Sequence, residues 1–538
     1  MADSDDAMTK LTIHSPAGSH QIDVADGQTV RDALDVTDWR VRAACGGIGS
    51  CGACVVQVKS GEVSPLTLPE YQRLDQSARA KGWRLACQLR LNGDTQIQLN
   101  HLAKASSWHS IPMADLMPSS FQHREISEHV YGVAVDLGTT HLRVTLWNRR
   151  TGQRIASRKG INPQDSYGAD VLTRLDIACQ HPEKAKKLSQ LVRGAIIKAL
   201  RDMLAREVGE IKLMLSEIGQ VTIVGNTAML SLLTNQGYTD LLNPDFWQIQ
   251  VNCQPVDYNE WQAQWLLPHA KITVLPPVAG FVGSDLTADL VATSVCDSST
   301  AAMLLDVGTN TEIALWTGKK LFITSVPGGS AFESVGIQNG MPPESGAIVH
   351  IKQNENTLIL ETINHEPARG FCGSGLVDAI ADLVATKVLK PSGRFAQSTG
   401  GAGFALIADN PHTVIIGRDV DAFQRGKAAI ASAMETLLKL AEITWTDIER
   451  LCVCGAFGRH LDIKNAQALG LLPPISLEKI ELNADASLAG CELALLSENH
   501  FALFEKITAN AQTFNLSLTS DYEDRYINNF LLKPIRGE

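Results

Sequence analysis

The chain has 538 residues, too many for one hydrophobic core, since single cores seldom exceed about 250–300 residues. Its 44% hydrophobic and 20% charged residues are typical of a globular protein, and its formal net charge of −11 disfavours nonspecific binding to nucleic acid or to an anionic membrane surface. No apolar run reaches the roughly 18 residues that span a bilayer, and the start "MADSDDAMTK" is too acidic and polar for an ordinary signal peptide. We therefore expect a cytoplasmic protein of several domains.

Residues 8–100 have the pattern of a compact β-rich domain. "LTIHS" and "HQIDV" alternate apolar and polar residues and predict a hairpin, and "TVRDALDV" predicts a short helix. "VVQVKS", "WRLACQLRL" and "TQIQLN" predict three further strands, of which the second would carry Cys87.

Four cysteines of this domain have the C-x5-C-x2-C…C spacing of a 2Fe–2S ferredoxin loop: Cys45, Cys51, Cys54 and Cys87. Glycines and small residues fill "ACGGIGSCGAC", so the backbone can curl around a cluster and direct N–H groups at its sulfurs. Paired cysteines more often bind zinc, but the five-residue gap and the single distant fourth cysteine favour the cluster. The cysteines further along the chain are scattered, and we expect Cys452 and Cys454 to be packing residues of an apolar strand.

Residues 101–129 show no sustained hydrophobic period and contain many Ser and polar residues, so we expect a linker there. Two domains should follow, at 130–275 and 276–538. Leucine, valine, alanine, isoleucine and methionine recur at helical spacing between 182 and 208, which predicts an amphipathic helix with one buried face.

An internal repeat marks both of these domains. "AVDLGTTHLRVT" and "LDVGTNTEIAL" each read as a buried strand, a tight turn and a second strand. The turns are Asp136-Leu137-Gly138-Thr139-Thr140 and Asp306-Val307-Gly308-Thr309-Asn310. Glycine lets a backbone approach a phosphate, hydroxyl and amide groups can donate to its oxygens, and the aspartates can hold Mg²⁺ or position an attacking water. One such turn could be hairpin punctuation, but two on buried strands predict two lobes around a nucleotide.

This arrangement resembles the actin-like superfamily of ATPases. The resemblance implies that Asp285, in "GSDLTADL", is the acidic residue of the connecting helix, and that Gly455 and Gly458, in "CGAFG", make room for adenosine. Gly373 and Gly375, in "GFCGSGLVDAI", would place N–H groups at a helix N-terminus near an anion, although helix capping and close packing explain them equally well.

A ferredoxin module joined to an actin-like ATPase resembles the reductive activators of corrinoid-dependent methyltransferases, on motifs that include "CGGIGSCGAC", "AVDLGTT", "VGNTAML", "LDVGTNTEIA" and "GAFGRHLDIKNAQALGLLP". The resemblance implies an α/β protein, with a β-grasp ferredoxin domain followed by a two-lobed, ribonuclease H-like ATPase. It implies ATP-dependent reduction of a Co(II) corrinoid to Co(I), with a 2Fe–2S cluster, ATP and Mg²⁺ as cofactors. The partners would be a corrinoid protein and an electron donor, either a ferredoxin, a flavodoxin or a reductase, with a homodimer possible and no nucleic acid or membrane. Two alternatives stay open: a small-molecule kinase with a fused redox sensor, and a chaperone-like assembly factor.

Overall fold

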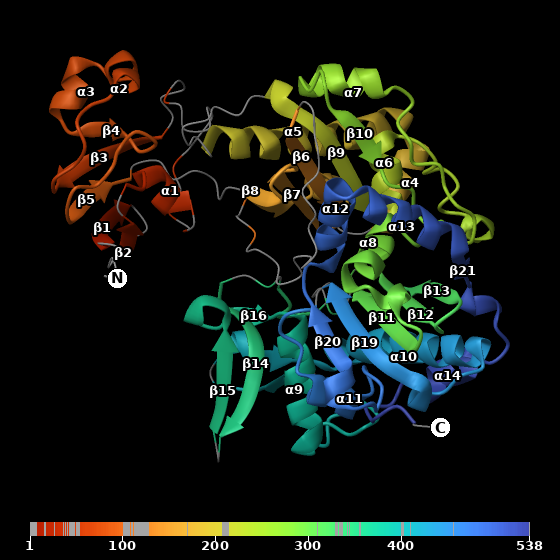
Figure 1. The fold of residues 1–538 in the computed structure, drawn as a ribbon. Coiled ribbons are helices and arrows are strands. Elements are labelled where there is room, and N and C mark those ends of the chain that lie inside the picture. Colours follow the sequence, from red (N-terminus) through yellow and green to blue (C-terminus); the bar gives the residue numbers. More distant parts are fainter. Residues whose placement is uncertain are drawn as a thin grey trace, which may run out of the picture.

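The computed structural model describes residues 8–15, 18–25, 27–35, 37, 39, 41, 49, 54–99, 108, 111, 129–168, 171–206, 215–308, 310–328, 332, 337–341, 343, 345–354, 357–399, 403–408, 410–455 and 457–536. Three large sheets follow one another along the chain (Figure 1), and two small sheets, β15-β14-β16 and β17-β18, accompany the third. Each large sheet packs against a hydrophobic core of its own. Within these ranges, no helix combines the length and the apolar character needed to cross a bilayer.

The N-terminal domain is a mixed five-stranded sheet with the strand order β2-β1-β5-β3-β4 and the parallel pair β1–β5 at its centre. Its elements are β1 (Met8–Ser15), β2 (Gly18–Ala25), α1 (Val30–Asp35), β3 (Val55–Ser60), α2 (Leu68–Arg73), α3 (Gln76–Ala80), β4 (Trp83–Leu85) and β5 (Thr95–Gln98). The predicted hairpin, helix and strands are confirmed, with one correction. The strand expected over 83–91 ends at Leu85, because the next residues turn back and the N–H groups of Gln88 and Leu89 both donate to the Leu85 carbonyl. Cys87 lies in that turn.

A buried ion pair holds α2 against β4. The Arg84 guanidinium donates to the Glu70 carboxylate at 2.7 Å, and both side chains are almost fully buried. Burial alone would raise the pKa of Glu70, but Arg84 and the backbone N–H groups of Thr67 and Leu85 stabilise the carboxylate and bring the pKa below its ordinary value.

The middle domain has a five-stranded sheet in the order β10-β9-β6-β7-β8. Its main elements are β6 (Tyr131–Leu137), β7 (His141–Asn148), β8 (Gln153–Ile161), α4 (Val171–Gln180), α5 (Pro182–Arg206), β9 (Ile218–Gly225), α6 (Thr227–Thr234), α7 (Tyr258–Trp265) and β10 (Lys271–Val274). The helix expected over 182–208 is confirmed as α5, and its apolar stripe enters the core of this domain.

The C-terminal lobe repeats this plan in a six-stranded sheet, β20-β19-β11-β12-β13-β21. In both sheets a central strand pairs in parallel on one side and antiparallel with the strand after its turn on the other, which confirms the internal repeat. The elements are α8 (Ser284–Thr293), β11 (Ala301–Val307), β12 (Thr311–Trp316), β13 (Leu321–Val326), β14 (Ala347–Asn354), β15 (Thr357–Thr362), β16 (Gly370–Phe371), α9 (Gly373–Ala385), β17 (Phe404–Ala405), β18 (Val414–Ile415), α10 (Gly417–Ala441), β19 (Ile448–Gly455), α11 (Ile463–Leu469), β20 (Ile480–Asn483), α12 (Ala486–Leu496), α13 (Glu498–Asn510), β21 (Ala511–Thr513) and α14 (Tyr522–Asn528).

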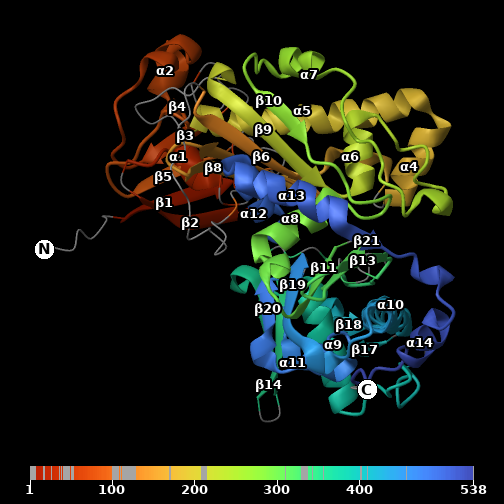
Figure 2. The ribbon, with the colours of Figure 1, turned by 45° about the vertical axis from the view of Figure 1, so that its right-hand side comes forward.

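Two helices, α8 and α12, lie between the two large sheets (Figure 2) and share one hydrophobic core with both. Although α12 lies between β20 and β21 of the C-terminal sheet in the chain, Cys491 on it donates to the carbonyls of Val135 and Thr222 in the middle domain. The buried Glu492 carboxylate lies 2.9 Å from the Arg154 guanidinium of β8. The two lobes are therefore joined by packing as well as by the chain.

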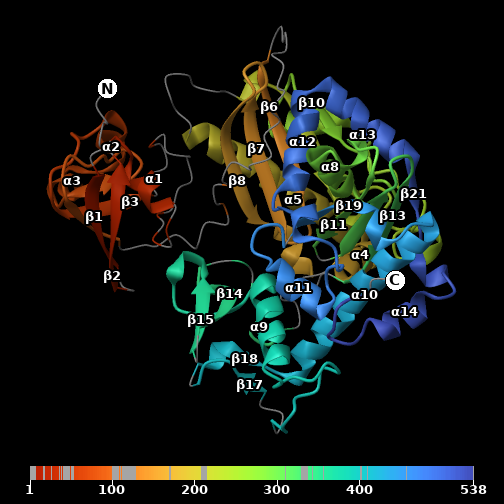
Figure 3. The same ribbon diagram turned by 60° about the horizontal axis from the view of Figure 1, so that its bottom comes forward.

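The N-terminal domain lies to one side of the two lobes (Figure 3). Arg31 of α1 brings its guanidinium within 3.8 Å of the Asp202 carboxylate of α5. Most of the expected linker, residues 101–129, lies outside the described residues. Of its described positions, Trp108 packs in the core of the middle domain and the N–H of Ile111 donates to the Ser157 hydroxyl at 2.9 Å.

Candidate functional site

Both predicted phosphate turns face one pocket between the lobes. The carboxyl ends of β6 and β11 meet there, because each turn follows the central strand of its sheet. The pocket is lined by Asp136, Gly138, Thr139, Thr140, His141, Arg143, Lys159, Asn226, Asp285, Asp306, Gly308, Asn310, Glu312, Phe332, Met341, Pro343, Cys372, Gly373, Ser374, Gly455, His460 and Ser487. Thr309 lies outside the described residues.

The aspartate of the first turn has a cationic partner. Asp136 is 5% exposed, and Arg143, directly opposite on β7, donates to it at 2.8 Å. Burial raises the pKa of Asp136, while the charge of Arg143 works against that rise. Lys159, the cross-strand neighbour of Arg143 on β8, adds a second cation to the same wall of the pocket.

The aspartate of the second turn faces acids instead. Glu312 occupies the position directly opposite Asp306, and Asp289 of α8 lies beside Asp306, where the two buried carboxyl groups can share a hydrogen bond when one of them is protonated. Burial raises the pKa of Asp306 to about 6. Burial, reinforced by neighbouring carboxylates, raises the pKa of Asp285, Asp289 and Glu312 well above their ordinary values.

This excess of buried negative charge suits a divalent cation. Mg²⁺ in nucleotide sites is usually held by one or two carboxylates together with phosphate oxygens and water. Among the described residues no three acidic, His or Cys side chains form a metal site by themselves. Asp306, Asp285 and Glu312 offer carboxylate oxygens, and Arg143 and Lys159 offer positive charge to a phosphate chain.

Hydrogen bonds fix the backbone of both phosphate turns, and side chains of these turns line the pocket. The N–H groups of Gly138 and Gly308 donate within their own turns, to His141 and Asn310. Asn226 donates to the Thr139 hydroxyl at 3.0 Å. The N–H groups of these two glycines are therefore engaged within the turns, while the turn side chains and the two cations, Arg143 and Lys159, can donate to a phosphate.

The four glycines of the resemblance divide into two pairs. Gly455 and Gly373 line the pocket. Gly455 has φ +71, and a Cβ there would lie 2.4 Å from an Asp306 carboxylate oxygen, so only glycine fits this approach. Gly375 and Gly458 lie behind the lining, where a Cβ would meet the carbonyls of Ile348 and Asn483 at 2.0 and 2.4 Å. Close packing is thus a sufficient reason for these two.

The sequence reasoning missed Arg143, Lys159, Asp289 and Glu312. A signal for two of them was available: in an antiparallel pair joined by a tight turn, a residue early in the second strand lies directly opposite the aspartate that ends the first. The cross-strand pairs Asp136–Arg143 and Asp306–Glu312 follow this rule.

Two of the four predicted cluster ligands, Cys54 and Cys87, lie among the described residues, and their positions fit a 2Fe–2S cluster. The Sγ atoms of Cys54 and Cys87 lie 3.3 Å apart, both side chains are buried, and two thiols at this spacing can bind one metal ion together. Cys45 and Cys51 lie outside the described residues. Cys452 and Cys454 are fully buried on β19 within the core between the lobes, which confirms that they are packing residues.

Comparison with known proteins finds three family profiles along the chain. A profile described as the 2Fe–2S iron–sulfur cluster binding domain matches residues 15–92, one described as the RACo middle region matches 131–298, and one described as the C-terminal domain of RACo, the ASKHA domain, matches 300–536. The chain therefore has a 2Fe–2S domain and a nucleotide-binding ASKHA domain.

Similar proteins extend over most of the chain. The "Corrinoid activation enzyme RamQ" of Eubacterium limosum is 27% identical over 439 residues, which cover 77% of this chain and 72% of that protein. The "[Co(II) methylated amine-specific corrinoid protein] reductase" of Methanosarcina barkeri is 24% identical over 426 residues, which cover 72% and 75%. A solved "Reductive activator for corrinoid,iron-sulfur protein" has the same fold, with a TM-score of 0.64, 23% identity and coverage of 97% and 98%. The chain belongs to the RACo family of reductive activators of corrinoid proteins.

Proposed function

We propose that this protein restores an inactive Co(II) corrinoid to Co(I) on a corrinoid protein of a methyltransferase system, with electrons that pass through its 2Fe–2S cluster and with ATP as the energy source. The observation that carries the proposal is that one chain unites two buried cysteines at metal-binding distance with a pocket in which two phosphate turns face each other. The two curated relatives are named for corrinoid activation and for reduction of a Co(II) corrinoid protein.

The energetics explain why an ATPase lobe is joined to a ferredoxin. A plant-type 2Fe–2S centre has a potential near −400 mV. A corrinoid acceptor that lies on the order of 100–200 mV lower makes the electron transfer uphill by roughly 2–5 kcal/mol. ATP binding or hydrolysis can supply this if the closed form of the lobes binds the corrinoid protein differently from the open form.

The pocket side chains support a division of roles. Asp136, Asp285 and Asp306 would hold Mg²⁺ or the attacking water, and the side chains of Thr139, Thr140, Thr309 and Asn310 would contact phosphate, with Gly138 and Gly308 shaping their turns. Gly455 and Gly458 would make room for adenosine. Gly373 and Gly375 would place backbone N–H groups at the N-terminus of α9 near an anion. The cluster, when bound, supplies one-electron transfer. Cys45, Cys51, Cys54 and Cys87 would hold it.

Further parts of the proposal concern the surroundings. We expect cytoplasmic localisation, an electron donor of the ferredoxin, flavodoxin or reductase class, and a homodimer as a possible form, with neither nucleic acid nor membrane as a partner. The proposed domain limits are 8–100, 101–129, 130–275 and 276–538. Separate sheets in the first, third and fourth of these ranges support the division.

The central experiment mixes the intact protein with a Co(II) corrinoid protein, a chemical reductant and Mg-ATP, and follows the absorbance of Co(I). Co(I) should form with ATP and not without it. Formation of Co(I) at the same rate without ATP would contradict the proposal, and a phosphorylated small molecule among the products would favour a kinase.

The cluster has its own test. The anaerobically purified protein should be red-brown, with about two irons and two sulfides per chain, the composition of this cluster type. Cys54→Ala and Cys87→Ala should bleach the spectrum, as should changes at Cys45 and Cys51. Cys452→Ala is the matched control, because its thiol is buried in a core and far from the ferredoxin domain in the chain. A colourless protein containing zinc would refute the cluster.

A further inference from the structure

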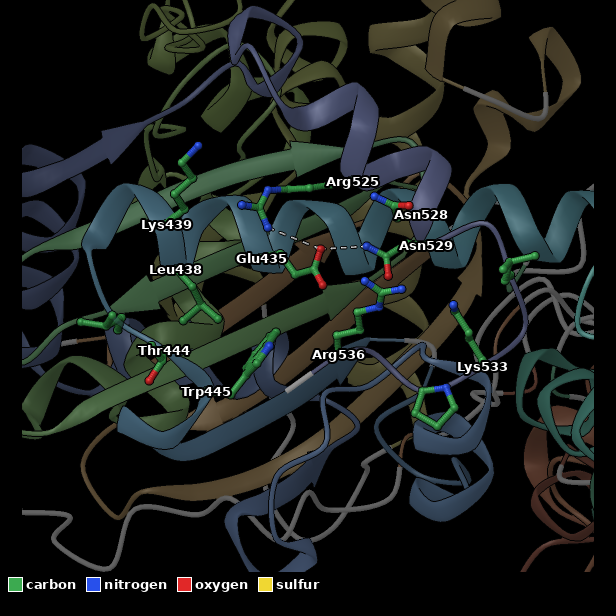
Figure 4. A pocket seen from close by; sticks show the side chains of 13 residues that line it. Glu435, Leu438, Lys439, Thr444, Trp445, Arg525, Asn528, Asn529, Lys533 and Arg536 are labelled. Atoms are coloured by element: carbon green, nitrogen blue, oxygen red, sulfur yellow. Dashed lines mark hydrogen bonds and ion pairs between the residues drawn. The ribbon is translucent and has the colours of Figure 1, made fainter. Parts of the chain in front are cut away.

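A second pocket lies near the end of the chain, between the C-terminal half of α10, the segment after it, α14 and the residues that follow α14 (Figure 4). It shares no lining residue with the nucleotide pocket. Its volume is about 280 Å³, and its walls are Glu435, Leu438, Lys439, Ile443, Thr444, Trp445, Arg525, Asn528, Asn529, Leu531, Lys533, Pro534 and Arg536.

The pocket carries an excess of positive charge in a protein whose net charge is −11. Four cations line it, against the single acid Glu435. Two of them are partly neutralised: Lys439 and Arg525 both pair with Asp521, and Arg525 also lies 3.7 Å from Glu435. The Nε of Arg525 is buried and has no acceptor among the described residues.

The other two cations, Lys533 and Arg536, form no ion pair with any acidic side chain of the described residues. Their backbone is nevertheless fixed. Leu532 and Ile535 alternate with them and are buried in the core of the lobe, and the N–H of Leu532 donates to the Pro391 carbonyl at 2.8 Å. The anchored segment therefore presents at the pocket two cations that pair with no acid of the described residues.

A third cation lies beneath them. Lys427 of α10 is 1% exposed and donates to the Leu531 carbonyl at 2.8 Å. Burial lowers the pKa of this ammonium to about 7, the negative charge of Glu435 works against that lowering, and the positive charge of Lys533 adds to it. Lys427 is therefore only partly charged near neutral pH, and the excess positive charge at the pocket comes from Lys533 and Arg536.

The remaining walls suit an organic body. Leu438 and Trp445 are buried side chains with a face on the pocket, and Thr444, Asn528 and Asn529 supply hydrogen-bonding groups around them (Figure 4). Small-molecule sites typically combine apolar walls with a few polar groups that fix orientation.

We propose that this pocket binds a small organic anion, a phosphate ester or a carboxylate, with its anionic group at Lys533 and Arg536 and its body against Trp445 and Leu438. Phosphate and carboxylate are the groups that lysine and arginine recognise through charge-assisted hydrogen bonds. The site is separate from the nucleotide pocket and does not depend on the function proposed above.

The test is calorimetric titration of the intact protein, saturated with Mg-ADP so that its nucleotide pocket is filled, with 3-phosphoglycerate, which carries both anionic groups. Glycerol serves as the neutral probe. We expect binding of 3-phosphoglycerate and none of glycerol. Lys533→Gln and Arg536→Gln should each weaken binding about tenfold, and the double variant should lose it.

Lys319→Gln, an exposed lysine on the turn between β12 and β13, is the matched control and should bind the probe like the wild type. Unchanged affinity of the double variant for Mg-ADP shows that it is folded. Three results would overturn the proposal: no binding of 3-phosphoglycerate at 10 mM or so, a folded double variant that still binds it, or equal weakening by Lys319→Gln.

Discussion

The two phosphate turns have nearly the same sequence and each follows the central strand of its sheet, yet their cross-strand registers and the charge of their surroundings differ. Asp136 faces Arg143 across its strand pair, whereas Asp306, in the equivalent position, faces Glu312 and has Asp289 beside it. The residue early in the second strand of each repeat produces part of this difference, and Asp289 of α8 adds to it at Asp306.

The consequence is a division of labour across the pocket. The first lobe brings cations, Arg143 and Lys159, which can contact phosphate oxygens, and the second lobe brings carboxylates, which attract a metal ion. The two similar lobes thus place positive charge on one wall of the pocket and negative charge on the other. A phosphate chain can bind at the positive wall and its metal ion at the negative wall.

The largest expected effect is on catalysis. Asp306→Ala should reduce the ATP turnover number by about 100- to 1,000-fold, and Asp136→Ala should also reduce it strongly, because each removes a carboxylate that organises the metal or the water. Asp297→Asn, an exposed aspartate of the same lobe, should leave turnover unchanged. Steady-state phosphate release measures all three. Wild-type rates in both alanine variants would show that the pocket does not hydrolyse ATP.

The asymmetry of the turns should also appear in stability. Arg143→Ala leaves Asp136 buried without its partner and should lower the free energy of unfolding by about 3 kcal/mol, as measured by urea titration. The double variant Arg143→Gln/Asp136→Asn removes the uncompensated charge and should recover most of the loss. If the single and double variants were equally unstable, the pairing of Asp136 with Arg143 would not be the cause.

The second turn should make the nucleotide-free protein less stable as the pH rises. Burial raises the pKa of Asp306 to about 6 from an unfolded value of 3.8, so the folded state holds this proton more tightly than the unfolded state. Its contribution to stability is full below about pH 4 and is lost as the pH rises to about 6, with a magnitude of about 2–3 kcal/mol.

The difference between wild type and Asp306→Asn in urea titrations at pH 4.5, 5.5 and 6.5 reports on Asp306 together with the carboxyl groups whose pKa it raises, Asp285, Asp289 and Glu312. The free energy of unfolding of the variant should increase relative to that of the wild type as the pH rises. A difference that does not change with pH would mean that Asp306 titrates normally. Mg-ADP should stabilise the wild type more at pH 7 than at pH 5, because the metal competes with protons for the carboxylates.

The smallest expected effect comes from the residue that distinguishes the turns. Glu312→Gln removes one of two acids that face each other, and should stabilise the nucleotide-free protein by about 1 kcal/mol. It should also raise the Mg²⁺ concentration needed for half-maximal ATP turnover. Glu478→Gln, at an exposed site, should change neither quantity. A Mg²⁺ requirement identical to that of the wild type would show that Glu312 does not contribute to binding of the metal ion.

Local patterns were sufficient for much of this architecture. Alternation predicted the first hairpin, helical spacing predicted α5, and the repeat of Asp-x-Gly-Thr turns predicted two similar lobes. The strand expected at Cys87 failed because "RLACQLRL" is apolar enough for a strand, while the chain turns back after Leu85. The hydrophobic pattern of a sequence indicates which side chains are buried, but it does not distinguish buried residues of a strand from buried residues of a turn.

The sequence by itself determined the chemistry of this protein, because cysteine spacing and paired glycine–threonine turns are local features whose geometry few residues fix. Tertiary structure alone decided which groups from distant parts of the chain meet. Asp289 reaches Asp306 from α8, and Cys491 of α12 bonds to the middle sheet although its helix lies between β20 and β21 of the C-terminal sheet in the chain. Contacts between residues distant in the chain depend on how sheets and helices pack, and the free energy of that packing is spread over whole cores, which no short motif records.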